Sequence, residues 1–547
     1  MKYISLIALT GFALLASCSS NPKKETAAAT TDTVLAADIK QHIAVLANDS
    51  LLGRKPFTVG EEKTIAYIAA QFKKMGLEPG NKGSYFQDVP MVEIKSNPAD
   101  MTIAGKATMD LKPGMDFVAS TRREVPAINL KNSPLVFAGY GIVAPEYKWN
   151  DYAGLDVKGK TVVVLVNDPG FQSPEKFFKG DTMTYYGRWT YKYEEAARQG
   201  AAGVLIVHQT EPASYGWQVI QNSFSGSKLY LQQADKHMNR CQVEGWISEE
   251  VAKKLLGDAG VTGDIRAYAR KKDFKAVPLN STVSLALTTK LKYAMSHNVI
   301  ATLKGSTTPD EYVLYSAHWD HFGINKPVAG DSIYNGAVDN ASGVASVLSI
   351  AKLFTQQKEK PKRSIVFLSV TAEEQGLLGS EYYGTHPVYP LNKTVADLNL
   401  DALSDFGETS DFSITGKGQN DLDDYVEALT KPLGWTVVGD TKPSSGSYYR
   451  SDHFNFAKVG VPALDLHNGA NAVGHDTAWG QAKLKEYNEK HYHQPSDSYS
   501  DTMNTKGMAQ TTELMYKLGV KLSNETTFPG WKAGSEFKAI RDKAMGK

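Results

Sequence analysis

From His297 onward the chain alternates short apolar runs with longer amphipathic segments, and this alternation constrains the fold more than any other feature. Continuous apolar runs predict strands at residues 312–317, 364–370, 395–400 and 463–466. Apolar residues at helical spacing predict helices at residues 342–356, 376–384 and 505–522. This alternation predicts an α/β fold with a mainly parallel, mixed sheet covered by helices. Ligands bind such sheets beyond the carboxyl ends of the strands, so functional residues are expected there.

Composition and charge exclude several classes of protein. The 547 residues allow roughly three or four domains. The chain has 60 Lys and Arg residues against 59 Asp and Glu residues, and the net charge of +1 argues against a nucleic-acid partner. Two cysteines, Cys18 and Cys241, can neither crosslink a protein of this size nor build a zinc ribbon. We expect a core that depends on packing, and no pattern indicates an obligate protein partner.

Residues 1–17 are predicted to be a signal peptide. Lys2 precedes an almost wholly apolar run at residues 3–16, which is shorter than the ~20 residues of a membrane span. The run ends in Leu15-Ala16-Ser17-Cys18, which resembles the lipobox of bacterial lipoproteins and implies a lipid on Cys18. The alternative is an ordinary cleaved signal peptide. Residues 18–35 are rich in Ser, Lys, Thr and Ala, which predicts a flexible tether.

A lipid on Cys18 would anchor the protein to a membrane of the bacterial cell envelope, facing the periplasm or the cell surface. Ser19, the residue after this cysteine, is not the acidic residue often linked with retention in the inner membrane. The sequence therefore favours the outer membrane.

One domain is interrupted by another. Residues 36–110 are predicted to begin the main domain with two helices, and residues 291–547 to complete it. Residues 111–290 are predicted to form a smaller inserted α/β domain, because strand-like runs such as 161–166 and 203–207 alternate with a helix and glycine turns. This insert contains no catalytic constellation.

Carboxylates and imidazoles follow the predicted strands of the main domain. They are His318 and Asp320, Asp339 before the first helix, Glu373 and Glu374, Asp401 and, later, His493. Each alone has a structural explanation, such as a solvated turn, a helix N-cap or a hydrogen-bonded core histidine. Their occurrence at successive strand ends of one sheet indicates a functional site.

The chemistry of this set is narrow. Imidazole and carboxylate ligands without cysteine suit zinc or another borderline divalent metal. Two histidines, two aspartates and one glutamate can hold two ions if one aspartate bridges them. One member of the Glu373–Glu374 pair then remains as a general base.

The order of these motifs resembles the co-catalytic di-zinc exopeptidases of the bacterial leucyl aminopeptidase type. The motifs are His-x-Asp, Gly-x-x-Asp-Asn-x-Ser-Gly, Glu-Glu, Asn-x-Asp and a late Tyr-His. Glutamate carboxypeptidase and the transferrin receptor ectodomain are more distant relatives of that family. The resemblance implies a zinc-exopeptidase fold in which residues 130–215 are similar to a protease-associated insert. Leu51-Leu52-Gly53-Arg54 is similar to the N-terminal segment of the family.

The resemblance implies a cofactor of two zinc ions. His318 and Asp401 match ligands of one ion, while Asp339 matches the bridging ligand. Glu374 and His493 match ligands of the other ion. Four further histidines match no ligand and are expected to be structural residues or to lie at the rim: His321, His467, His475 and His491.

The resemblance also implies roles for three other residues. Glu373 matches the general base, and Asp320 matches the carboxylate that orients the first histidine ligand. Tyr448 matches a tyrosine near the substrate carbonyl and is a candidate oxyanion donor, for which Tyr449 and Tyr492 compete.

The implied activity is that of an aminopeptidase acting on peptide substrates with a free N-terminus. The same scaffold also supports carboxypeptidase, dipeptidase and glutaminyl cyclase reactions, and an intact His318 and Asp320 argue against the cyclase. A receptor-like binding protein without metals is a further alternative. Such a protein should have substituted ligands, whereas every expected ligand position is filled here.

Overall fold

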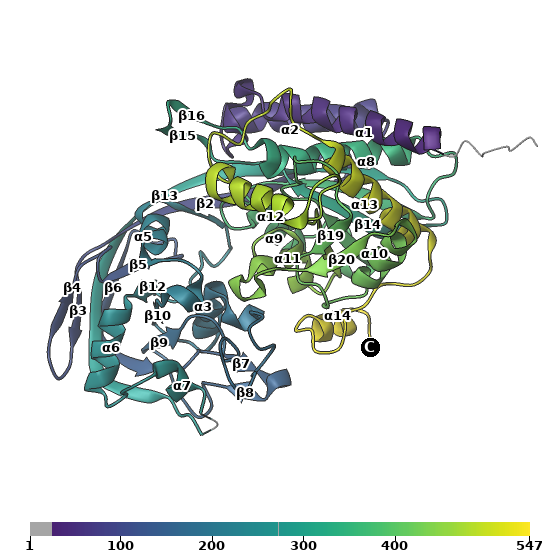
Figure 1. Cartoon of the computed structure of the whole chain (residues 1–547). Helices are drawn as coiled ribbons and strands as arrows, with labels where there is room; N and C mark the ends of the chain where they lie inside the picture. The colour runs from purple at the N-terminus through teal and green to yellow at the C-terminus, as the bar shows by residue number, and fades with distance from the viewer. Residues whose placement is uncertain (1–24, 272) are drawn as a thin grey trace, which may run out of the picture.

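The computed structural model describes residues 25–271 and 273–547 and consists of two lobes (Figure 1). The inserted lobe comprises residues 99–288, and the main lobe comprises the other described residues. The predicted signal peptide and Cys18 lie outside the described residues. Among the helices that the structure describes, none combines the length and apolar character needed to cross a bilayer.

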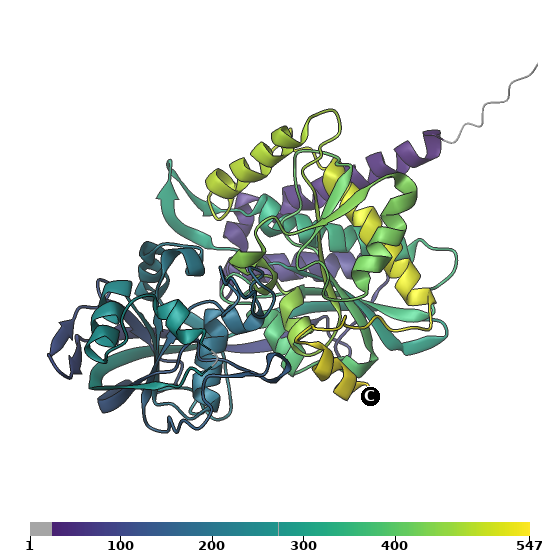
Figure 2. The same cartoon turned by 60° about the horizontal axis from the view of Figure 1, so that its bottom comes forward.

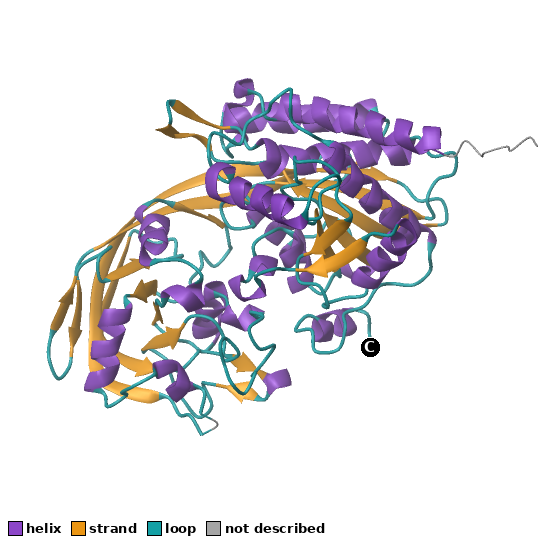
Figure 3. Cartoon of the chain, viewed as in Figure 1, coloured by secondary structure: helices purple, strands orange, loops and turns teal. Residues whose placement is uncertain are grey.

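The sheet of the main lobe confirms the predicted α/β fold (Figure 3). Its strands are, in spatial order, β13 (Val277–Leu303), β17 (Arg363–Val370), β14 (Thr308–His318), β18 (Thr394–Asn399), β21 (Ala463–Asn468), β19 (Asp411–Ile414) and β20 (Thr436–Gly439). The four central strands, β17, β14, β18 and β21, are mutually parallel. β13 and β19 pair with them in antiparallel orientation, so the sheet is mixed.

Helices cover both faces of this sheet, and the central strands β17 and β18 are therefore buried on two sides. On one face lie α1 (Glu25–Leu46), α2 (Val59–Lys74), α8 (Ser342–Thr355) and α13 (Lys506–Asn524). On the other face lie α9 (Leu378–Thr385) and α11 (His453–Lys458). Alternate residues of β14 show the division: Val313 and Tyr315 pack with the first set, whereas Leu314 packs with the second.

The register of the parallel strands brings their carboxyl ends to one edge. His318 of β14 is paired with Val370 of β17, and Ser316 of β14 with Asn399 of β18. The residues that follow these strands therefore emerge side by side, which is the arrangement the sequence predicted.

The inserted lobe has its own core, and its strands continue the hydrogen-bonded sheet of the main lobe through β13. Its main strands are β6 (Ala127–Phe137), β9 (Thr161–Leu165), β10 (Gly203–Val207), β12 (Val243–Ile247) and β5 (Phe117–Ser120). Its helices include α3 (Trp189–Arg198), α5 (Trp217–Ser225), α6 (Glu249–Asp258) and α7 (Ile265–Ala269). These strands and helices make the inserted lobe an α/β unit, and Figure 2 shows it beside the main lobe.

Two long strands join the lobes. β2 (Phe86–Pro98) and β13 run antiparallel from the main lobe into the insert. The remaining elements of the main lobe include the hairpin β15 (Gly323–Val328) and β16 (Asp331–Tyr334), α10 (Leu422–Thr430), α12 (Thr477–Glu486) and α14 (Lys538–Ala544). In the insert, β3 (Met101–Ala104), β4 (Met109–Leu111) and β11 (Lys228–Leu231) complete the sheet.

The structure corrects three predicted boundaries. The insert begins before residue 111, because Met101 and Met109 of β3 and β4 are buried in its core. The predicted boundary at residues 290 and 291 falls inside β13, which continues unbroken from one lobe to the other. α1 begins at Glu25, so the predicted tether of residues 18–35 is wrong over its last part. Leu35 and Ile39 pack this helix onto the core.

Candidate metal centre

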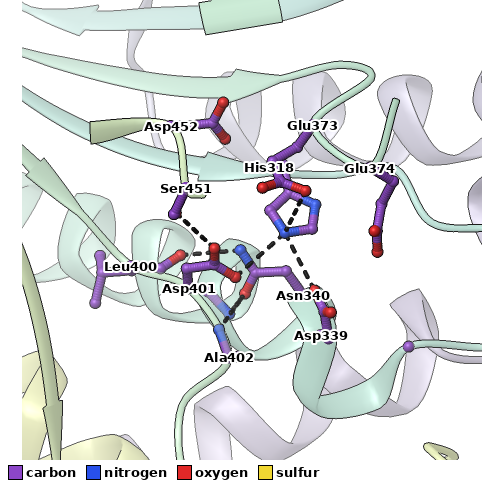
Figure 4. Close-up of polar contacts among 12 residues, drawn as sticks. His318, Asp339, Asn340, Glu373, Glu374, Leu400, Asp401, Ala402, Ser451 and Asp452 are labelled. Carbon is purple, nitrogen blue, oxygen red and sulfur yellow. Dashed lines mark hydrogen bonds and ion pairs between the residues drawn. The ribbon is translucent and has the colours of Figure 1, made fainter. Parts of the chain in front are cut away.

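The predicted metal ligands meet at the carboxyl edge of the parallel strands (Figure 4). His318 ends β14, Glu374 lies just beyond β17, and Asp401 lies just beyond β18. Asp339 lies in the turn directly before α8, and His493 lies in the segment that follows α12. Residues far apart in the chain are therefore collected by the strand register.

Asp339 presents one carboxylate oxygen to each of two histidines. Its Oδ1 lies 3.2 Å from His318 Nε2, and its Oδ2 lies 3.2 Å from His493 Nε2. Each of these two histidines also faces a second carboxylate. For His318 it is Asp401, whose Oδ1 lies 3.2 Å from His318 Nε2. Glu374 Oε2 likewise lies 3.2 Å from His493 Nε2. Ligand atoms about 2.0–2.2 Å from one tetrahedral zinc ion lie roughly 3.3 Å apart, so these spacings fit two ions that share a carboxylate.

The electrostatics of the cluster also favour bound cations. Burial, followed by the charges of Asp339 and Glu373, raises the pKa of Glu374 well above its ordinary value. Burial lowers the pKa of His318, but Asp401 and Glu373 outweigh it and hold that pKa well above its ordinary value. The buried carboxylates thus exceed the positive charge that their own imidazoles supply. Divalent cations would balance this excess.

The two adjacent glutamates point to different places, as a base and a ligand must. Glu374 extends toward His493 and Asp339, whereas the Glu373 carboxylate lies on the other side, with Oε2 4.0 Å from His318 Nε2 (Figure 4). Among the described residues, two sets of three have ligand atoms within 4.8 Å of one another, namely His318–Glu373–Asp401 and His321–Asp339–Glu374. Glu373 belongs to the first set, but its contact of 4.0 Å with His318 is longer than the contact of 3.2 Å that Glu374 makes with His493.

Asp320 contacts the site both through its backbone carbonyl and through its side chain. His318 Nδ1 lies 3.1 Å from the backbone carbonyl oxygen of Asp320, to which it donates, but 3.8 Å from the carboxylate. The carboxylate instead accepts a hydrogen bond of 3.0 Å from the backbone N–H of Glu373. Asp320 therefore orients the histidine through its main chain and holds the glutamate loop through its side chain.

Three polar residues that the sequence did not assign brace the ligand loops. Asp497 accepts hydrogen bonds of 2.9 and 3.0 Å from the backbone N–H groups of Val338 and Asp339. Ser451 Oγ donates to Asp401 Oδ2 at 2.6 Å. The third is Asn340, whose side chain joins the loop before α8 to the loop after β18 through the Leu400 carbonyl oxygen at 3.0 Å. In the sequence these three residues are marked only by lying near a predicted ligand. That position does not reveal which group each of them hydrogen-bonds.

Arg54 ties together the loops beneath the metal centre. Its buried guanidinium donates to the carbonyl oxygens of Trp319, Gly336 and Leu46 at 2.8, 2.9 and 2.8 Å, and also to that of Asn335. These carbonyls belong to the segments that carry His-x-Asp, the bridging aspartate and the end of α1. The sequence analysis noted Arg54 as part of the Leu-Leu-Gly-Arg motif. The carbonyl oxygens that it binds are known only from the fold.

We expect Arg54→Met to lower the free energy of unfolding by at least about 3 kcal/mol, because several buried carbonyls would lose a charged donor. Urea denaturation of the metal-free protein measures this loss without involving the metals. The matched control is Lys63→Met, which removes a surface hydrogen bond to the Ser50 carbonyl oxygen and should change the stability little. Equal effects of the two substitutions would contradict the role given to Arg54.

His321 corrects the expectation that it is a structural or rim residue. Its side chain is buried, its Nδ1 lies 2.5 Å from Glu374 Oε1, and its Nε2 has no hydrogen-bond partner among the described residues. The contact leaves Glu374 Oε2 facing His493. His321 thus belongs to the metal centre, and its spacing of three residues from His318 was the only available signal.

Tyr448 is not placed as the sequence predicted. Its ring packs in an apolar cluster with Phe454 and Phe537, and its hydroxyl is buried without a partner in the described part of the chain. Tyr449 is also engaged elsewhere, donating to Glu536 at 2.9 Å. Tyr492 stacks on His493 with ring centroids 3.7 Å apart and lines the cavity described next. Of the three competing tyrosines, Tyr492 is the one beside the ligands.

A cavity of about 750 Å³ opens onto the centre between the two lobes. Glu373, Glu374 and His493 line it on the main-lobe side, and α3 and β11 contribute its opposite wall. The volume lies within the range typical of small-molecule and peptide sites. A substrate at the metal centre must therefore lie against the inserted lobe.

The family match lies in the second half of the chain. Residues 298–519 match the family described as Peptidase family M28, and this segment contains every predicted metal ligand. A probable zinc metalloprotease of Pyrenophora teres f. teres is 48% identical over 83 residues, covering 15% of this chain and 17% of that protein. The probable leucine aminopeptidase 2 of Aspergillus oryzae is 29% identical over 237 residues, covering 40% of this chain and 43% of that protein.

A solved structure matches over a longer range at lower identity. The aminopeptidase from Aneurinibacillus sp. strain AM-1 is 19% identical, with a TM-score of 0.47, covering 90% of this chain and 95% of that one. The first curated relatives are matched over only 17% and 18% of their own length. The family match is confined to residues 298–519, and the chain spans less than a fifth of the length of the first curated relatives.

Proposed function

We propose that this protein is a zinc-dependent exopeptidase and that it acts as an aminopeptidase on peptides with a free N-terminus. The observation that carries this proposal is Asp339, which lies between His318 and His493 with one oxygen toward each. The M28 match over residues 298–519 supports a peptidase, and the relative named as a leucine aminopeptidase supports the choice of reaction.

The chain's own residues account for binding and proton transfer. Two zinc ions, when bound, would supply Lewis acidity toward the peptide carbonyl and lower the pKa of an attacking water. Glu373, which is not engaged by the second histidine, accepts the proton of that water and returns it to the leaving amine. For the donor to the oxyanion that develops on the carbonyl we propose Tyr492, and its stacking on His493 at the cavity wall supports this choice.

The test is an assay of zinc-loaded protein lacking only residues 1–18, with peptides whose N-terminus is free or acetylated. Mass spectrometry of the products identifies the end from which residues are lost. Release of single N-terminal residues from the free-amine peptides alone supports the proposal. Loss of C-terminal residues from both kinds would establish a carboxypeptidase instead, and no cleavage of either would contradict a peptidase.

We also propose that a lipid on Cys18 anchors the enzyme in the outer membrane and that the insert is a protease-associated domain. The lipobox-like Leu15-Ala16-Ser17-Cys18 supports the first part, and the α/β architecture of residues 99–288 supports the second. Cys18→Ser should move the protein from the membrane fraction of a bacterial host to the soluble fraction. Unchanged membrane association would contradict the anchor.

A further inference from the structure

The cavity between the lobes has charged groups on the wall opposite the metal centre. α3 and β11 of the inserted lobe form much of this wall, and α3 faces the main lobe (Figure 1). Lys458 at the end of α11 pairs with Glu194 of α3 at 2.8 Å, which links the two lobes directly. Arg122 pairs with Glu244 at 2.8 Å within the insert. These cations are neutralised by protein carboxylates.

Arg188 differs from them because it has no such partner. Its guanidinium makes no hydrogen bond or ion pair with any of the described residues, and its Nε is buried. Its Cδ lies close to Gly446 of the main-lobe loop that leads to Arg450, where a Cβ would stand 3.4 Å away. Arg450 also lines the cavity, and within the described part of the chain its guanidinium donates only to the carbonyl oxygen of Ser445, at 2.9 Å.

An arrangement of two guanidinium groups without a carboxylate is unfavourable unless an anion completes it. Burial, followed by the positive charge of Arg450, lowers the pKa of Arg188 to about 10. The planar guanidinium forks match a carboxylate, with which they form charge-assisted hydrogen bonds. Arg188 is partly buried, and a partly desolvated guanidinium is less stable without an anionic partner than with one.

The start of α3 adds to the positive potential. Arg188 is the N-cap residue of this helix, no side chain caps the first turn, and the first turn contains no acidic residue. Trp189 and Thr190 of that turn line the same cavity. The unpaired N–H groups and the dipole of a helix N-terminus favour a negative charge beside them.

We propose that Arg188 and Arg450 form a carboxylate-binding subsite for the peptide substrate, so that the inserted lobe selects peptides that bear an anion. This inference rests on the proposed function. The carboxylate is supplied by the C-terminus of a short peptide or by an acidic side chain. Because one arginine comes from each lobe, a bound carboxylate would also hold the lobes together around the substrate.

The experiment compares kcat/KM for two matched pairs of peptides. The first pair is Leu-Gly-Gly and its C-terminal amide, and the second is Leu-Asp-Gly amide and Leu-Asn-Gly amide. The enzymes are the zinc-loaded wild type, Arg188→Gln, Arg450→Gln and the control Arg198→Gln. Arg198 lies at the other end of α3, with 52% of its side chain exposed, so its replacement should leave both ratios as in the wild type.

We expect the wild type to prefer the anionic member of at least one pair by about 10- to 100-fold, the effect of a hydrogen bond to a charged group. Arg188→Gln should reduce that preference toward unity, mainly through KM, and Arg450→Gln should reduce it in the same pair. The pair that responds identifies the source of the carboxylate. Arg450 is exposed, so its replacement does not endanger folding and keeps the test decisive.

Two failures are distinguishable. Cleavage of both members of each pair at equal rates, unchanged in Arg188→Gln, would overturn the subsite and leave the peptidase standing. Absence of cleavage of all four peptides would overturn the proposed function. Calorimetric binding of the same peptides to the Glu373→Gln enzyme measures the subsite without turnover, and equal affinities for acid and neutral peptides would again overturn it.

Discussion

Glu373→Gln is expected to lower kcat by about 10²–10⁴-fold while the protein still binds both metal ions and its substrate. The carboxylate of Glu373 does not make the contacts that place Glu374 against His493 and Asp339. Its replacement therefore removes a proton acceptor and leaves the remaining ligand atoms in position. Metal analysis after dialysis, together with kcat and KM, measures both parts of the expectation.

The adjacent residue provides the matched comparison. Glu374→Gln removes a charged oxygen that lies 3.2 Å from His493 Nε2, so metal affinity should fall and added zinc should restore part of the activity. The two substitutions differ by one position in the chain and have the same chemistry. If Glu373→Gln lost metal and responded to zinc while Glu374→Gln kept both ions, the two roles would be reversed.

His493→Ala is expected to remove one of two bound zinc equivalents and to lower kcat/KM by more than about 100-fold. The reason is that His493 Nε2 is the imidazole that faces both Asp339 Oδ2 and Glu374 Oε2, at 3.2 Å each. Loss of a residue that merely supports a ligand already costs about 10–100-fold, and loss of a ligand should cost more. Zinc content by mass spectrometry and steady-state kinetics check the two effects.

The control for this prediction lies two residues away. His491→Ala removes a half-buried imidazole whose Nδ1 contacts Ser496 Oγ at 3.0 Å. It should retain both zinc equivalents and nearly full activity. A fully active His493→Ala protein with two bound ions would remove that histidine from the metal centre.

Much of the main lobe could be predicted because its signals are local. Each strand is an apolar run next to a turn, and β17 and β18 lie within a residue of the predicted ranges 364–370 and 395–400. His318, Glu374 and Asp401 end or follow those strands, so placing the strands parallel was enough to bring these three ligands together. The alternation of strands and helices specified that parallel order.

The errors have a different origin, because each involves a partner that is distant in the chain. The insert was predicted to start too late because β3 and β4 are buried only through pairing with each other and with β13. Tyr448 was assigned from its spacing to Ser451, but its ring direction depends on packing against Phe537. His321 was dismissed because a histidine after a strand has no local mark of a contact with Glu374.

The sequence by itself determined the order of the elements, the parallel centre of the sheet and the set of imidazoles and carboxylates at its edge. These follow from periodicity and from residue types at strand ends, which are local properties of the chain. Only the tertiary structure decided which oxygen faces which nitrogen, that Arg54 binds carbonyl oxygens of the ligand loops, and that Arg188 and Arg450 line the same cavity. Those relations depend on side-chain direction and burial between segments that are separated by tens to hundreds of residues, which no pattern along the chain records.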